Sequence, residues 1–335
     1  MMLFNLCGRI ILLFIFLVCN HSVAAERDIG NHIELPPAQL EQLELDNFKL
    51  LGLVKLDQTA GQDYPLMEFS GLAWDHDQET LIILSDRGFL IHTKPIFDGD
   101  RLLDLKLLSY HFLKTKNGKK LVHAFADSEG LALLNSNNNI KGDTELIVSF
   151  ERNPRIIQYT SSGEYISRHT LNNKLDDIQN YSGANKALEA ITLHKDYKII
   201  TGPERPLKNS KSNLLSLHSL KSDTWQFSPE NENHGSLVGL TTLPDGRLIA
   251  LERIYFNIFA GVSNAIHLIT LSPDDLQIQK VSKLNPSASY FNDNFEGISW
   301  HKANRFFIIS DDNDSPLQKT LLVYFEIPGL EIKSE

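Results

Sequence analysis

The sequence predicts an all-β protein, a β-propeller of four-stranded blades, and three observations lead to this prediction. A short phrase centred on Gly or Ala occurs five times, and its central residues lie 59, 60, 49 and 58 positions apart. Each copy is followed by a turn and a second apolar run with a polar ending. Each interval also has room for two further strands. Four short strands in roughly 50 to 60 residues are typical of a propeller blade, whereas a helical solenoid requires a 3.6-residue periodicity.

The repeated phrase supplies the first strand of each blade. Its five copies are Phe69–Trp74, Ser128–Leu133, Leu188–Leu193, Leu237–Leu243 and Phe295–Trp300. The second strands are Leu81–Arg87, Leu146–Arg152, Ile199–Arg205, Leu248–Arg253 and Phe307–Asp312. Leu243–Arg247 contains Pro-Asp-Gly and predicts the hairpin turn between them. In the second unit, Arg155–Thr160 and Tyr165–Leu171 supply the remaining strands.

The repeats define one domain, which we place at residues 46–330. Five blades are counted from Phe48 to Pro328, and the last shows three strands, ending with Thr320–Ile327. Phe48–Leu56 is available as its fourth strand and would close the ring, removing exposed sheet edges. A diverged sixth blade is the alternative. Residues 26–45 are predicted to be a leader segment and residues 331–335 a tail.

Residues 1–25 have the pattern of a signal peptide. Arg9 is the one charged residue before Glu26, and the apolar run Ile10–Val18 is followed by small residues ending at Ala25. A buried N-terminal strand or helix is the alternative. We therefore expect an exported protein, periplasmic or secreted. Lipid attachment at Cys19 would need a small residue where Val18 stands, which argues against a lipoprotein.

Composition excludes several classes of function. The 335 residues include 32 basic and 42 acidic ones, for a net charge of −10, so nucleic acid is not an expected partner. The hydrophobic and charged fractions, 42% and 22%, are those of a globular protein, and no second apolar run predicts a transmembrane span. Both cysteines, Cys7 and Cys19, precede the predicted cleavage site. The mature chain would therefore have neither disulfides nor thiol chemistry.

The motifs also resemble those of a known family. The stretches SGLAWD, DSEGLALL, LEAITL, GLTTLPDGRLIALER, NFEGISW and ISDDND are similar to those of the phytase-like propellers, also called "esterase-like activity of phytase". The resemblance covers roughly residues 48 to 327. It implies an exported bacterial propeller that hydrolyses an ester or phosphate ester.

Three glutamates occupy equivalent positions in the repeat. Glu129, Glu189 and Glu296 precede the central Gly or Ala, while Ser70 and Val238 stand there in the other units. A propeller brings equivalent residues of its inner strands around one axis, and converging carboxylates suit a hard divalent cation. These strands also look like the metal-bearing strands of calcium-dependent lactonase and gluconolactonase propellers. We therefore predict a divalent cation, with Ca²⁺ the best match.

Acidic and basic residues also follow the second strands. Each of the first four units ends in an acid followed by Arg, which suggests that Arg87, Arg152, Arg205 and Arg253 bind a small anionic substrate through its carboxylate or phosphate. Asp86 and Asp311, which end two of these strands, are further candidate metal ligands. The alternative is that these acids and arginines pair between blades and hold the ring together without a ligand.

Other candidate residues rest on weaker patterns. His123 lies shortly before Glu129 and is a candidate general base, although a lone histidine is more often structural. The sequence Asp75–Asp77 falls at a hairpin turn, and Asp311–Asp314 lacks the Gly of an EF-hand loop, where Pro316 stands. No serine nucleophile elbow, zinc-binding H-E-x-x-H or P-loop is present.

Two functions follow as hypotheses. The first is a metal-assisted hydrolase of phosphoric or carboxylic esters, with its site at the mouth of the central channel. The second is a non-catalytic propeller of the cell envelope that binds a protein, a glycan or a small ligand. A propeller fold alone does not decide between them.

Overall fold

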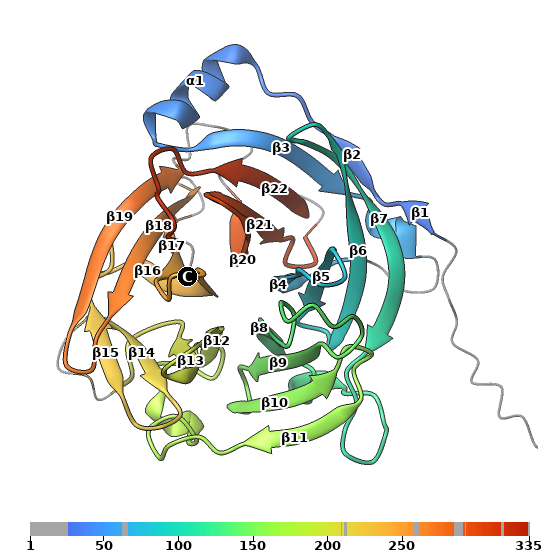
Figure 1. The fold of residues 1–335 in the computed structure, drawn as a ribbon. Helices are drawn as coiled ribbons and strands as arrows, with labels where there is room; N and C mark the ends of the chain where they lie inside the picture. Colours follow the sequence, from blue (N-terminus) through green and yellow to red (C-terminus); the bar gives the residue numbers. More distant parts are fainter. Residues whose placement is uncertain are drawn as a thin grey trace, which may run out of the picture.

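The computed structural model describes residues 26–61, 66–208, 210, 213–257, 261–284, 291, 293–315 and 318–333. These residues form five antiparallel sheets, arranged as blades around a central axis (Figure 1). The predicted all-β propeller and the count of five blades are therefore confirmed. The predicted signal peptide lies outside the described residues. Within them, no helix has the length and apolar character needed to cross a membrane.

Four blades are built from consecutive strands, each running from an inner strand at the axis to an outer strand at the rim. The first contains β4 (Phe69–Asp75), β5 (Thr80–Ser85), β6 (Phe89–Asp98) and β7 (Arg101–Phe112). The second contains β8 (Ser128–Leu134), β9 (Glu145–Phe150), β10 (Arg155–Thr160) and β11 (Tyr165–His169). The third contains β12 (Leu188–His194), β13 (Lys198–Pro203), β14 (Leu215–Ser219) and β15 (Thr224–Phe227). The fourth contains β16 (Gly235–Thr242), β17 (Leu248–Asn257), β18 (Gly261–Leu271) and β19 (Leu276–Leu284).

The fifth blade joins the two ends of the repeat region. Its inner strands are β20 (Asn294–Lys302), β21 (Arg305–Asp311) and β22 (Leu321–Glu326), and its fourth strand is β3 (Lys49–Leu56). β3 pairs antiparallel with β22, with Val54 opposite Leu322. The predicted closure of the ring by an N-terminal strand is therefore confirmed, and it leaves no open edge between the first and last blades.

The leader segment forms more regular structure than the sequence indicated. β1 (Arg27–Asp28) adds to the edge of the first blade, and β2 (Gly30–His32) adds to the fifth. Helix α1 (Pro37–Leu45) follows and lies beside β3 (Figure 1). Its first residue is a proline, which costs the helix no hydrogen bond because the first N–H groups of a helix have no partner inside it. Three short 3₁₀ turns complete the list: η1 (Gln58–Gly61), η2 (His123–Phe125) and η3 (Ile178–Asn180).

The hydrophobic core is divided into five clusters, one at each seam between neighbouring blades. Each blade is therefore covered on both faces, and the apolar runs of the second strands are buried, as in Leu81–Leu84. This explains why these strands are continuous apolar runs rather than alternating patterns. At one seam the rings of Phe48 and Phe325 stack at 4.2 Å, which fixes the start of β3 against β22.

Each inner strand contains an irregularity at the repeated phrase. The register shifts between Phe69 and Gly71 in the first blade, and the same shift occurs in the four other blades. The central glycine lets neighbouring inner strands approach closely, because a Cβ on Gly130 would lie 2.5 Å from the backbone oxygen of Glu189. Such bulges turn a side chain out of its regular direction. Here the shift falls on the residue before the Gly or Ala.

Candidate functional site

The bulges place one ring of side chains around the axis. Its members come from the five inner strands and are Ser70, Glu129, Glu189, Val238 and Glu296. The three glutamates are 8%, 5% and 9% exposed, and one carboxylate oxygen from each lies within 4.8 Å of the others. The structure therefore brings together the three glutamates that the repeat predicted to converge.

A second ring lies at the ends of the second strands. The pairing registers place its five equivalent positions at Asp86, Glu151, Glu204, Arg253 and Asp311. The sequence repeat aligns Glu252 with Glu204. In the structure Arg253, which pairs with Ser236 of β16, occupies the position equivalent to Glu204. Glu252 points elsewhere and accepts hydrogen bonds from His267 Nε2 at 2.8 Å and from the backbone N–H of Glu230.

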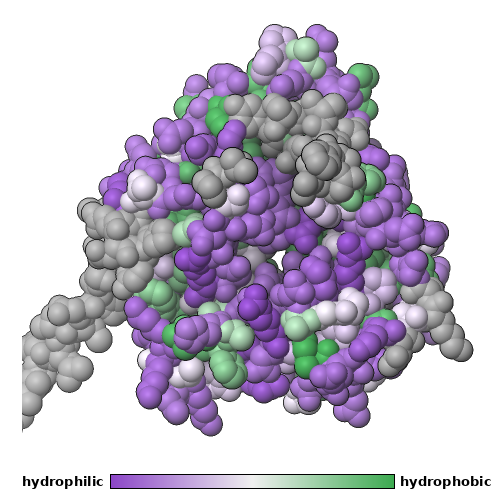
Figure 2. Space-filling model, turned by 180° about the vertical axis from the view of Figure 1, so that it is seen from behind, coloured by the Kyte–Doolittle hydropathy of each residue, from purple (hydrophilic) through white to green (hydrophobic). Residues whose placement is uncertain are grey.

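All members of the two rings except Ser70 and Val238 line a cavity of about 450 Å³ at one mouth of the channel, which we call the acidic mouth. Its eight carboxylates are Asp86, Asp127, Glu129, Glu151, Glu189, Glu204, Glu296 and Asp311. Its four cationic side chains are Arg152, Lys186, Arg205 and Arg253. Viewed from this side, hydrophilic residues surround a central opening (Figure 2). The surplus of carboxylates makes the cavity attractive to cations.

Arg253 neutralises part of this charge. Its Nη2 donates to Glu204 Oε1 at 2.9 Å, and its Nη1 donates to Glu296. Lys186 Nζ donates to the second oxygen of Glu204 at 2.6 Å, and Asn294 Nδ2 donates to Glu296 at 2.9 Å. The predicted ion-pair ring is thus present in one sector, between the third and fifth blades.

Three carboxylates of the second and third blades lack such partners. Among the described residues, no hydrogen-bond donor contacts the side-chain oxygens of Glu129, Glu151 or Glu189, and none of the three forms an ion pair. The same residues supply two more groups whose oxygens lie within 4.8 Å of one another, Asp127–Glu129–Glu151 and Glu151–Glu189–Glu204. Buried charges of one sign without partners are costly unless a cation or protons neutralise them.

Burial and mutual repulsion change the acidity of these groups. Burial, followed by the charge of Glu189, raises the pKa of Glu129 well above its ordinary value. Burial, followed by the charge of Asp127, raises the pKa of Glu151 to about 8. Burial also raises the pKa values of Asp86 and Asp311 to about 8. The charges of Asp311 and Glu296 add to the effect on Asp86, and the charge of Glu296 adds to the effect on Asp311. These carboxyl groups can therefore exchange protons near neutral pH.

The remaining predicted site residues lie in different places. Arg205 lines the cavity and donates to the backbone oxygen of Gly235 at 2.9 Å, and Arg152 lines it with its guanidinium 3.1 Å from Asp127. Arg87 is not among the lining residues and pairs with Glu68 and Asp314. His123 lies exposed in η2, also outside the lining.

Asp75 and Asp312, one from each acidic motif of the sequence, have structural roles. Asp75 accepts hydrogen bonds from the backbone N–H groups of Asp77 and Gln78, both at 3.0 Å, and so closes the β4–β5 turn. Asp312 is fully buried and accepts from Thr320 Oγ1 at 2.7 Å, which ties the β21–β22 loop to the blade.

Four charged lining residues are not among the residues that the sequence predicts for the site: Asp127, Glu151, Lys186 and Glu204. Glu151 and Glu204 had a signal, because both stand in the acid–Arg pairs that end the second strands. In these two pairs both the acid and the arginine line the cavity. Lys186 and Asp127 lie just before inner strands and had no repeated pattern to identify them.

Comparison with known proteins identifies the family. The family model described as "Phytase-like: Esterase-like activity of phytase" matches residues 64–314. This chain belongs to the phytase-like family. The matched region of this phytase-like protein begins just before β4 and ends after β21, so it includes every carboxylate of the acidic mouth. No curated protein gives a significant match.

Several solved structures are similar to this phytase-like chain. A gluconolactonase from Xanthomonas campestris has 13% identity and a TM-score of 0.39, covering 91% of this chain and 99% of its own. A glycosyl hydrolase from Bacteroides ovatus has 11% identity and a TM-score of 0.43, covering 80% and 86%. The Swd1 propeller from Myceliophteria thermophila has 11% identity and a TM-score of 0.37, covering 90% and 100%.

Proposed function

We propose that this phytase-like propeller is an exported, metal-assisted hydrolase of phosphoric or carboxylic esters, with its site at the acidic mouth. The observation that supports the proposal is that the buried carboxylates Glu129, Glu151 and Glu189 form no ion pair among the described residues. All the donor atoms are oxygens, which is the ligand type that Ca²⁺ and other hard divalent cations prefer.

These residues fit such a cation. Glu129, Glu189 and Glu296 would hold it, since one carboxylate oxygen from each lies within 4.8 Å of the others. Glu296 is engaged by Arg253 and Asn294, and Glu129 forms a second such group with Asp127 and Glu151. A bound divalent cation would polarise the ester or phosphoryl oxygen and stabilise the charge that develops on it.

The protein's own side chains would bind and orient the substrate. Arg152 and Arg205 line the cavity and carry the positive charge that an anionic ester needs in order to approach a carboxylate-rich mouth. Glu151, whose pKa is raised to about 8, can accept a proton from the attacking water or return one to the leaving group at its carboxylate oxygen.

The proposal is tested by metal analysis and a substrate screen on the purified protein. Bound metal is measured by mass spectrometry, and p-nitrophenyl phosphate, p-nitrophenyl acetate and inositol hexakisphosphate are tested with Ca²⁺ and with chelator. We expect metal-dependent turnover that is reduced by about a hundredfold in Glu129→Gln and Glu189→Gln. Loss of a residue that only supports a metal ligand already lowers metal affinity or activity by about 10- to 100-fold. Glu232→Gln is the matched control, because Glu232 is exposed and outside the lining.

Each negative outcome has a distinct meaning. Absence of bound metal, together with turnover that is unchanged in both glutamine variants, would overturn the metal site. Bound metal without turnover of any ester would favour the alternative function, a propeller that binds its ligand without catalysis.

A further inference from the structure

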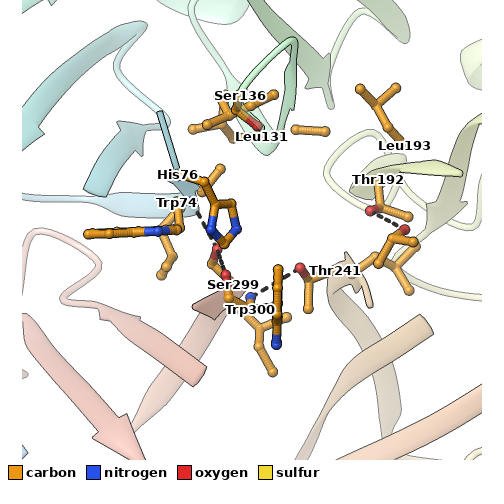
Figure 3. Close-up of a pocket in the computed structure, with 16 residues that line it drawn as sticks. Trp74, His76, Leu131, Ser136, Thr192, Leu193, Thr241, Ser299 and Trp300 are labelled. Atoms are coloured by element: carbon orange, nitrogen blue, oxygen red, sulfur yellow. Dashed lines mark hydrogen bonds between the residues drawn. The ribbon is translucent and has the colours of Figure 1, made fainter. Parts of the chain in front are cut away.

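The channel has a second mouth, at the opposite end of the inner strands from the carboxylate rings. It contains a cavity of about 120 Å³, and its lining includes Trp74, His76, Ser136, Thr192, Thr241 and Trp300. We call it the aromatic mouth. Figure 3 shows side chains from all sides of the ring gathered around this opening. The lining contains no Asp, Glu, Lys or Arg, in contrast to the acidic mouth.

An indole is fixed at this mouth with part of its surface exposed. Trp300 is partly exposed, its Nε1 donates to the backbone oxygen of Ala303 at 2.8 Å, and its backbone N–H donates to Thr241 Oγ1 at 3.1 Å. Its ring lies 4.8 Å from the imidazole of His76, centroid to centroid. A ring held by its own hydrogen bond, on a backbone held by a second one, is a preformed apolar platform, since little freedom remains to be lost when a ligand stacks on it.

Polar groups without charge stand beside this platform. Burial lowers the pKa of His76, so its imidazole is neutral at pH 7, and among the described residues no hydrogen bond engages its ring nitrogens. The hydroxyls of Thr192 and Thr242 share one hydrogen bond of 2.8 Å, which leaves further capacity on both oxygens. In Figure 3, His76, Ser136 and Thr192 lie on different sides of the opening.

We propose that the aromatic mouth binds one pyranose ring of a neutral carbohydrate. A sugar ring offers an apolar C–H face to an indole and hydroxyls to an imidazole and to threonine side chains, and this cavity supplies both kinds of partner. The absence of acidic residues from the lining disfavours a quaternary ammonium ligand, and the absence of basic residues disfavours a phosphate. The size of the cavity limits the bound part to one ring, so a longer glycan would extend outwards.

This site is independent of the proposed ester hydrolysis, because the two cavities share no lining residue. It can therefore be tested while metal binding is blocked. The probes are the methyl glycosides of glucose, galactose, mannose and N-acetylglucosamine, titrated into the full chain in chelator. The signal is intrinsic fluorescence, because two of the three tryptophans, Trp74 and Trp300, line the cavity.

We expect saturable binding of at least one glycoside with a dissociation constant of about 1 mM. Trp300→Ala should weaken binding by about tenfold or more, Trp300→Phe by less, and His76→Ala by several-fold. For the variants that lack Trp300, binding is measured by calorimetry instead of fluorescence. Trp225→Phe is the matched control, because Trp225 is buried in the seam between the third and fourth blades. Its substitution should leave the affinity unchanged.

Three results would overturn the proposal. One is the absence of binding of all four glycosides at about 50 mM, far above the expected constant. Another is equal binding by wild type, Trp300→Phe and His76→Ala, which would place the sugar elsewhere. The last is tighter binding of glucose 6-phosphate or tetramethylammonium than of the neutral glycosides.

Discussion

Substitution of Glu151 by Gln tests how the acidic mouth affects stability. Glu151 is 7% exposed, and burial and neighbouring carboxylates raise its pKa from the ordinary value of 4.5 to about 8. A carboxyl group with a raised pKa keeps its proton in the folded state after the unfolded chain has lost it. Stability is therefore lost as the pH rises from 4.5 to 8, by about 5 kcal/mol for a shift of this size.

A glutamine at position 151 imitates the protonated glutamate at every pH. In chelator, Glu151→Gln should match wild type near pH 4.5 and become more stable as the pH rises, with an advantage of up to about 5 kcal/mol at pH 8. Urea denaturation monitored by fluorescence gives the free energy of unfolding at each pH. Ca²⁺ at about 100 times the dissociation constant should reduce this advantage, because it stabilises wild type by about 2.7 kcal/mol.

The control for this series is Glu232→Gln, which removes an exposed carboxylate outside the cavity lining. Its stability relative to wild type should not depend on pH. The reasoning is refuted if Glu151→Gln is no more stable than wild type at pH 8 in chelator, or if the difference between them is the same at pH 5 and pH 8.

Four further predictions follow from the same structure. Gly130→Ala should destabilise the fold by about 1–3 kcal/mol in urea denaturation, because its Cβ would meet the Glu189 backbone oxygen at 2.5 Å; an unchanged midpoint would contradict this. Arg253→Gln should cost about 3–5 kcal/mol in chelator, because two buried carboxylates lose their cation, and wild-type stability would contradict the ion-pair assignment. Deletion of residues 27–56 should expose the edge of β22 and cause the protein to associate, as seen by size-exclusion chromatography. A deletion variant that stays monomeric would contradict this. Ca²⁺ affinity, measured by calorimetry, should rise by about tenfold per pH unit between 6 and 8 if one proton is displaced, whereas a flat profile would exclude the carboxyls with raised pKa from the site.

The sequence was sufficient to predict the architecture because each blade repeats one local pattern. The phrase around Gly71, Gly130 and Gly297 marks a place where inner strands approach closely, so a steric requirement of the fold is visible as a repeated residue. Ring closure was predictable for a related reason, since the last unit lacked one strand and Phe48–Leu56 was available to supply it. The short strands and the helix of the leader segment repeat nothing, and the sequence showed no pattern for them.

The candidate site was only partly predictable. Residues that share a position on the inner strands, such as Glu129 and Glu189, could be grouped by counting from the glycine or alanine. The second ring could not be grouped in this way, because the alignment of Glu252 with Glu204 is wrong by one residue. A shift of one residue moves a side chain to the opposite face of a strand. Only the pairing of Ser236 with Arg253 shows that a cation occupies this place in the fourth blade.

The pairing of β3 with β22 also has a consequence for the order of folding. Residues 49–56 pair with residues 321–326, so β3 can join its blade only after β22, near the end of the chain, has been synthesised. Contacts between segments so far apart in sequence slow folding, since a long loop must close before they form. Until then the apolar segment that becomes β3 has no strand to pair with, and the incomplete propeller exposes two unpaired strand edges that can aggregate. The ring therefore closes late in folding, and the protein is most prone to aggregation before it closes.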